Sequence, residues 1–154
     1  MKKFILAALL TASVVSVFLA GCGSKEANFD VKALGSDLNS KIVYQDTLSE
    51  LDVDTASMFL NLADVNIANA SIYEGSGATA EEIVVLECAT AEDAAKAKEV
   101  LQTRVSEQIE SFTDYVPAEL TKLNSAVIKV NGKYAVLSVC DTPEEASKII
   151  SEYM

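Results

Sequence analysis

One apolar stripe in the second half of the chain constrains the fold more than any other feature. Six residues recur there at intervals of three or four positions: Ala94, Ala97, Leu101, Val105, Ile109 and Phe112. This spacing places the six side chains on one face of a helix of about five turns. Thr90 has the residue type of a helix cap, and Pro117 prevents further extension. A long helix that is apolar on one side must cover a sheet or another helix.

Segments on both sides of this helix have the composition of β-strands. The β-branched run 82–88 directly precedes it, and two further runs, 126–130 and 133–140, follow it. The dipeptide Asn131-Gly132 joins the last two runs, and this pair is the strongest short signal of a β-hairpin. Segment 65–74 is a fourth and more polar candidate strand. The chain is therefore expected to build a small sheet beside the long helix.

Shorter helices are expected near both ends of the mature chain. Residues 142–153 predict the last one, with Thr142 as its cap and Glu145 closing a capping box. Residues 30–42 have apolar residues at helical spacing, although Gly35 weakens that helix by about 1 kcal/mol.

A third short helix is expected over residues 54–62, where Met58, Phe59 and Leu62 would face inward. Asp54 or Thr55 would cap this helix. Together with residues 30–42, it would add two helices ahead of the sheet.

The order of these segments predicts an α+β fold. Cys88 and Cys140 each follow a strand and precede a helix with an acidic first turn, and they lie 52 positions apart. Such a repeat suggests a pseudo-twofold split β-α-β arrangement. We expect a permuted ferredoxin-like sheet with helices on one face, plus the extra N-terminal helices. The other face would be open to a partner or covered by residues 30–62.

The first 22 residues have the layout of an export signal. Two lysines precede an apolar run, residues 4–20, that ends in small residues. The ending Leu19-Ala20-Gly21-Cys22 resembles the bacterial lipobox, in which a diacylglyceryl group joins the cysteine thiol and the chain is cut before it. The resemblance implies cleavage between Gly21 and Cys22, and diacylglyceryl and N-acyl groups on Cys22. An ordinary secretory signal or an uncleaved span is the alternative, because the run approaches the minimum length of a membrane helix.

These features divide the chain into a signal peptide (1–21), a lipidated cysteine with a polar tether (22–29) and one domain (30–154). Without the two lysines of the signal, 10 basic residues face 23 acidic ones, a net charge of −13. An anionic protein is repelled by an anionic membrane, so the lipid must provide the anchor. Two acyl chains suffice for stable anchoring, whereas one is marginal. The expected location is the extracytoplasmic face of the cell membrane.

Four features together resemble a known family. They are the lipobox at Cys22, the strand at 82–86, the helix at 91–112, and the hairpin at 127–137 with its closing helix. From about Ser49 onward, the chain is similar to bacterial lipoproteins classed as Domain of Unknown Function 4358. The resemblance implies a Gram-positive source and a membrane-tethered, extracytoplasmic domain. It implies no active site, because the family pattern has no invariant catalytic motif.

Composition excludes several kinds of chemistry. The chain has no histidine, so it has no Ser-His-Asp triad, no Cys-His pair and no imidazole metal ligand. Its net charge of −11 is opposite to the basic footprint that nucleic-acid binding requires. We predict no catalytic residue, no cofactor, no metal and no nucleic-acid partner.

Two cysteines remain once Cys22 is lipidated. If Cys88 and Cys140 end two central, parallel strands, they lie on the same side of the sheet. Neighbouring strands are about 4.8 Å apart, which is close to the Cα separation that a disulfide accepts. The simpler interpretation is a pair of small buried hydrophobic residues. Reactivity as a thiolate would need a cation or a helix start to lower the pKa.

The acidic motifs are better explained by local structure than by a metal site or a catalytic pair. Asp52 and Asp54 lack the other oxygens of a calcium-binding loop, and Asp54 suits a helix cap. Glu81 and Glu82 are neighbours along a strand, so their side chains point to opposite faces and do not form a catalytic pair.

The leading functional hypothesis is a non-enzymatic surface lipoprotein whose domain binds a peptide, a protein or another component of the cell envelope. One alternative is a thiol enzyme or redox protein that uses Cys88 and Cys140. A further alternative is a small solute-binding lipoprotein with a pocket in a single domain.

Overall fold

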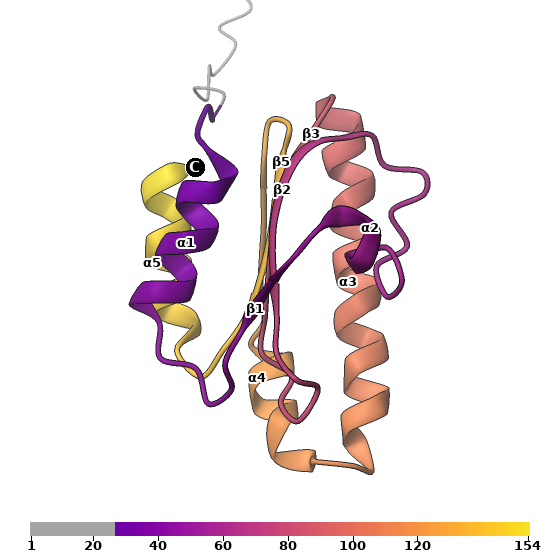
Figure 1. Ribbon diagram of the computed structural model, residues 1–154, viewed down its shortest axis with the longest axis vertical. Coiled ribbons are helices and arrows are strands. Elements are labelled where there is room, and N and C mark those ends of the chain that lie inside the picture. The colour runs from indigo at the N-terminus through magenta and orange to yellow at the C-terminus, as the bar shows by residue number, and fades with distance from the viewer. Residues whose placement is uncertain (1–26) are drawn as a thin grey trace, which may run out of the picture.

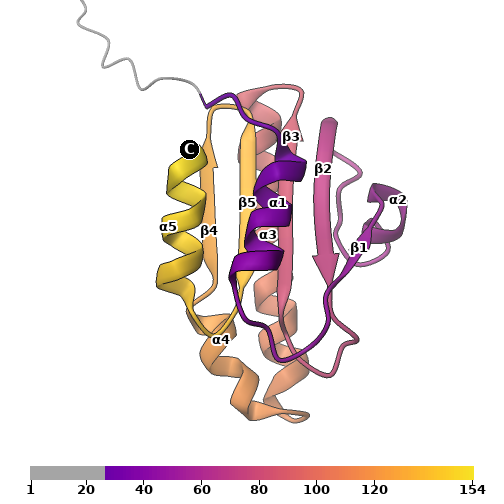
Figure 2. The same cartoon turned by 60° about the vertical axis from the view of Figure 1, so that its left-hand side comes forward.

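The computed structural model describes residues 27–154, which are built around a five-stranded sheet. The strands lie in the order β1-β2-β3-β5-β4, and each is antiparallel to its neighbours (Figure 2). Their bounds are Ser49–Leu51 (β1), Ile67–Glu74 (β2), Glu82–Cys88 (β3), Val127–Asn131 (β4) and Tyr134–Val139 (β5). The predicted signal peptide and the lipidation site at Cys22 lie outside the described residues.

Helices cover both faces of this sheet (Figure 1). On one face lie α1 (Val31–Lys41) and α5 (Pro143–Tyr153), which also contact each other. On the other face lie α2 (Val53–Ala56), α3 (Ala91–Thr113), the 3-10 helix η1 (Pro117–Glu119) and α4 (Leu120–Asn124). No helix among the described residues has the length and apolar character needed to cross a bilayer.

The two-sided cover follows from the alternation of side chains along the central strands. In β3, Val84 and Leu86 pack in the core beneath α3, whereas Ile83 and Val85 pack in the core beneath α1 and α5. All four side chains are fully buried. A strand buried on both faces has an uninterrupted apolar sequence, which is what residues 83–86 display.

The α+β class is confirmed, and so is the split β-α-β unit. Strands β3 and β4 run parallel, because both are antiparallel to β5, which lies between them. Helix α3 makes the crossover between them. The expectation that α3 and the last helix share one face was wrong. Helix α1, from the segment 30–62, covers the face away from α3, which is one of the two arrangements expected for that face. Ala146, Ile149 and Ile150 of α5 pack with α1, so α5 lies across the sheet from α3 and the predicted twofold relation fails.

Helix α1 approaches the sheet closely at Gly35. A Cβ atom there would overlap the Ser71 hydroxyl and lie 2.8 Å from the Ser71 Cβ on β2. The glycine therefore costs helix propensity but allows close packing of the helix on the sheet. Asp30 caps the helix by accepting a hydrogen bond of 2.9 Å from the Lys32 backbone N–H.

Of the other predicted helix caps, that of α3 is confirmed, whereas those of α5 and α2 are not. The Thr90 side chain accepts from the Asp93 backbone N–H at 3.1 Å, as expected for the start of α3. The Thr142 side chain makes no capping bond, so α5 begins without the predicted capping box. The cap of α2 is Asp52, and this helix has only four residues instead of the nine predicted.

Candidate functional site

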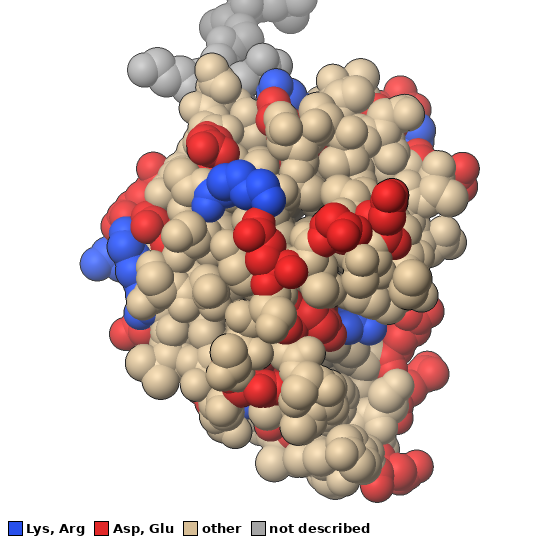
Figure 3. All heavy atoms as spheres, viewed as in Figure 1, with Lys and Arg blue, Asp and Glu red and all other residues tan. Residues whose placement is uncertain are grey.

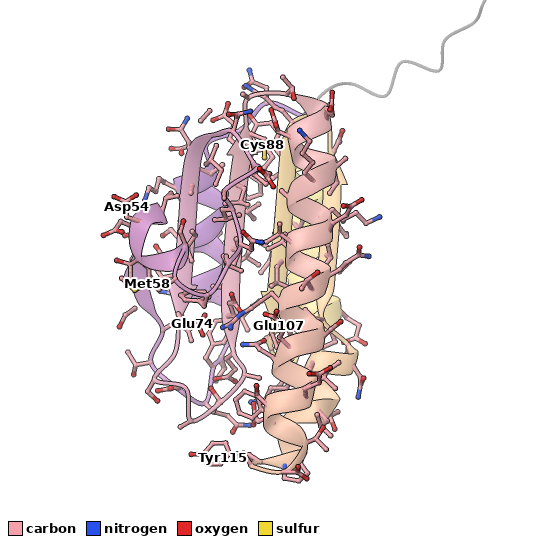
Figure 4. The ribbon with its side chains drawn as sticks, turned by 90° about the vertical axis from the view of Figure 1, so that its right-hand side faces the viewer. Asp54, Met58, Glu74, Cys88, Glu107 and Tyr115 are labelled. Carbon is pink, nitrogen blue, oxygen red and sulfur yellow. The ribbon has the colours of Figure 1, made fainter. Side chains whose placement is uncertain are left out.

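A groove of about 600 Å³ lies between α3 and the segment 57–65 that follows α2. Its lining combines apolar side chains with a polar rim: Phe59, Asn61, Asp64, Val65, Lys96, Glu99, Val100, Thr103, Arg104 and Glu107. Figure 4 looks onto this side of the molecule, with Met58 on one flank and Glu107 on α3. A concave surface with an apolar lining and a few polar groups is typical of a ligand site.

The segment 57–65 forms one wall of the groove because its apolar residues are anchored in the core. Leu60, Leu62 and Val65 are buried beneath α3, while Met58 between them and α2 is 85% exposed. The chain also turns tightly here, since the Leu62 backbone N–H donates to the Leu60 carbonyl at 2.8 Å. The wall is therefore anchored in the core on one side and exposed to solvent on the other.

Arg104 occupies one end of the groove and joins it to the sheet. Its Nη2 donates to Oε1 of Glu74 at 2.8 Å, and its Nε donates to Oε2 of Glu82 at 3.1 Å. Its Cζ lies 4.6 Å from the centre of the Phe59 ring, a cation–π contact. The guanidinium thus contacts β2, β3 and the groove wall at the same time.

The two carboxylates beside Arg104 lie in an unusual environment for acids. Burial raises the pKa of Glu74 to about 8, and the charge of Glu82 adds to this effect while Arg104 opposes it. Burial likewise raises the pKa of Glu82, whose side chain has no exposed surface. One arginine does not offset the cost of burying two carboxylate charges.

The rim of the groove carries excess negative charge. Lys96 is 3.6 Å from Asp93 and 3.7 Å from Glu92, so other acids already balance its charge. Within residues 27–154, no lysine or arginine nitrogen lies within 4.0 Å of the carboxylates of Asp64, Glu99 and Glu107. Acidic side chains also follow the α3 side of the molecule, on the right in Figure 3.

A second ionic cluster is centred on the buried Lys122 of α4. Its Nζ lies 3.0 Å from Glu81, 3.1 Å from Glu119 and 3.7 Å from Asp141. Burial lowers the pKa of Lys122, but hydrogen bonds to Glu81 and Glu119 outweigh burial and raise it. Glu81 also accepts from the backbone N–H groups of Gln45 and Asp46 at 2.9–3.0 Å. This cluster connects the loop 42–48 to α4. Its charged groups already have partners within the protein, so few hydrogen-bonding positions remain for a ligand.

Residues 42–140 match the model of a family described as Domain of unknown function (DUF4358). The chain belongs to this family. Comparison with curated proteins and with solved structures finds no match. The DUF4358 region extends from the end of α1 through β5. It therefore contains the whole sheet, the groove and the Arg104 cluster.

The structure separates the two cysteines of this DUF4358 chain. Cys88 packs in the core beneath α3 and Cys140 in the core beneath α1 and α5, and both are free thiols. The strands that they follow are antiparallel, so the expected placement at the ends of parallel strands was wrong. Burial raises the pKa of Cys88 to about 11 and also raises that of Cys140. The structure does not bring these thiols together.

The Arg104 cluster in the DUF4358 region was not predicted from the sequence, although the hairpin register contains a signal for it. Glu74 and Glu82 lie directly opposite each other on β2 and β3, on either side of the Gly75-Ser76-Gly77 turn. Like charges opposite each other destabilise a sheet unless a cation or a proton intervenes. Glu81 and Glu82 take part in separate clusters, as their neighbouring positions predicted.

Proposed function

We propose that this chain is a lipid-anchored, non-enzymatic binding module on the extracytoplasmic face of the cell membrane. The ending Leu19-Ala20-Gly21-Cys22 after an apolar run supports the anchor. Residues 23–28 form a short, mostly polar segment, which suits a tether to the folded domain. The groove along α3 is the observation that supports binding as the activity.

The position of the groove suits a tethered domain. The described chain begins beside the start of α1, at the end of the molecule where the C-terminus also lies (Figure 1). The groove lies along the side formed by α3, and α4 lies at the opposite end. A lipid attached ahead of α1 would therefore leave the groove accessible from the aqueous side.

The lining of the groove indicates the chemistry of its ligand. Phe59, Val65 and Val100 supply apolar contact, and Asp64 and Glu107 supply uncompensated negative charge. This combination fits a cationic group on an aliphatic stem, because electrostatic complementarity selects the charge and apolar area binds the stem. A lysine side chain of an envelope peptide and a free polyamine share this chemistry.

Calorimetry on the full chain in a mild detergent tests the binding activity. Spermidine and a short glycine peptide with one lysine are the two probes, and they distinguish a solute ligand from a peptide ligand. We expect one of them to bind and Glu107→Gln to weaken the binding about two- to fivefold, the range for an exposed ion pair. Glu110→Gln, on the exposed side of α3 outside the groove, is the matched control. Absence of binding by both probes contradicts the proposal.

Fractionation of cells that express the full chain tests the anchor separately. We expect the wild-type protein in the membrane fraction, with a mass that includes acyl groups on Cys22. Cys22→Ala should remove that added mass and prevent the cut before residue 22. An unmodified Cys22 in the wild-type protein would refute the lipidation.

A further inference from the structure

The two carboxylates that bind Arg104 each use only one oxygen for it. Glu74 offers Oε1 and Glu82 offers Oε2. The remaining oxygens, Oε2 of Glu74 and Oε1 of Glu82, are both buried and find no hydrogen-bond donor within residues 27–154. Buried acceptors without donors are rare and costly, so this pair needs an explanation.

The sheet places these two oxygens near each other. Glu74 and Glu82 face each other directly in the β2–β3 register, where Cβ atoms are about 4.5–5.5 Å apart. The two side chains lie within hydrogen-bonding reach of each other, although two ionised carboxylates have no hydrogen to share. Figure 4 shows Glu74 beside α3, at the level of Glu107.

We propose that Glu74 and Glu82 form a buried site that binds one proton, shared between Oε2 of Glu74 and Oε1 of Glu82. With the proton present, one carboxyl donates an O–H bond to the other, so both unpartnered oxygens are satisfied. The single negative charge that remains balances the positive charge of Arg104. Without the proton, the same buried site carries a net charge of −1 and two acceptors that face each other.

The charged groups on the surrounding elements do not supply a second cation. On α3, Arg104 is the cation in contact, and Glu107 is exposed and acidic. The neutral side chain of Gln108 faces Glu82 and lowers its pKa, but burial outweighs this effect. Lys122 and Glu119, next to the β2–β3 turn, bind each other and Glu81. On β1, Ser49 lies opposite Glu74, and on β5, Val139 lies opposite Glu82.

The pKa of Glu74, raised to about 8 by burial, agrees with proton uptake at neutral pH. The folded state then binds a proton that the unfolded chain releases near the ordinary glutamate pKa of about 4.3. Stability from this pair is complete below that value and is lost as the pH rises toward about 8. Because Arg104 also lines the groove, loss of the proton makes that end of the groove more negative. Proton binding at this site does not depend on any ligand in the groove.

Glu74→Gln is the decisive variant, because an amide reproduces the protonated carboxyl. Its oxygen can accept from Arg104 while its NH₂ group donates to Oε1 of Glu82. We expect the free energy of unfolding of the full wild-type chain to fall between about pH 5 and about pH 8 relative to the variant, which lacks this loss. Glu110→Gln should keep the wild-type dependence. Identical pH dependence of Glu74→Gln and the wild type would overturn the proposal.

Carbon-detected NMR of the side-chain carboxyls in the wild-type chain provides a test that requires no variant to fold. One glutamate pair should titrate far above the others, near pH 8, because burial raises the pKa of Glu74 to about 8. That signal should be absent from a folded Glu82→Gln chain. If every glutamate of the wild type titrates at its ordinary pKa, the shared proton does not exist.

Discussion

Packing in this domain can favour a residue that has a low propensity for the secondary structure in which it lies. Gly35 is unfavourable in a helix, and the sequence alone identifies it as a weakness of α1. The structure gives the reason for its presence, because any Cβ at this position meets Ser71 on β2. For a change from glycine to alanine, helix propensity raises the stability of the domain and the steric overlap with Ser71 lowers it. Measuring such a substitution shows which effect is larger.

We expect Gly35→Ala to destabilise the domain by about 1–3 kcal/mol, the usual cost of overpacking. The gain of about 1 kcal/mol in helix propensity should not compensate for it. Urea unfolding of the full chain measures the change. The double variant Gly35→Ala with Ser71→Gly removes the obstructing side chain and should recover part of the loss. A stabilised Gly35→Ala chain would show that the close contact is not needed.

The elements of this fold differ in how much local sequence determines them. Helix α3 and the hairpin of β4 and β5 lie within one or two residues of their predicted bounds. The local signals for α3 are its periodic apolar residues and its cap, Thr90. The local signal for the hairpin is Gly132, which adopts a φ of +54° in the turn. Strand β1 has three residues and exists by pairing with β2, so no local signal predicts it.

The arrangement of the elements was harder to predict than their identity. The side of the sheet on which α5 lies depends on its contact with α1, which comes from the other end of the chain. The Arg104 cluster likewise depends on contacts between distant segments. It requires both the register of β2 and β3 and the rotation of α3 about its axis. The uninterrupted apolar runs 83–86 and 134–137 were signals of a sheet covered on both faces.

Lys122 connects elements rather than stabilising its own helix. We expect Lys122→Met to lower the free energy of unfolding by about 3–5 kcal/mol, because Glu81 and Glu119 then remain as unpaired buried charges. The double variant Lys122→Met with Glu81→Gln removes one of those charges and should be less destabilised. Chemical denaturation measures both. A loss below about 1 kcal/mol would mean that water enters the cluster and solvates the acids.

The two cores on either side of the sheet keep Cys88 and Cys140 away from solvent. Both Cys88 and Cys140 are nearly unexposed, and burial raises both thiol pKa values. We expect a thiol reagent to modify them at the rate at which the domain opens, and much faster in denaturant. Timed mass spectrometry measures this. Rapid modification of Cys88 or Cys140 in the folded chain would favour the thiol chemistry that the structure does not support.

We propose that the acidic groove beside α3 is where this domain binds its ligand. Amide NMR of the labelled full chain in detergent, titrated with spermidine and then with the lysine peptide, locates binding most directly. We predict saturable shifts in segment 57–65 and along residues 96–107 of α3 with one of the probes. Saturable shifts confined to the α1 and α5 face, or no saturable shift with either probe, would contradict the claim.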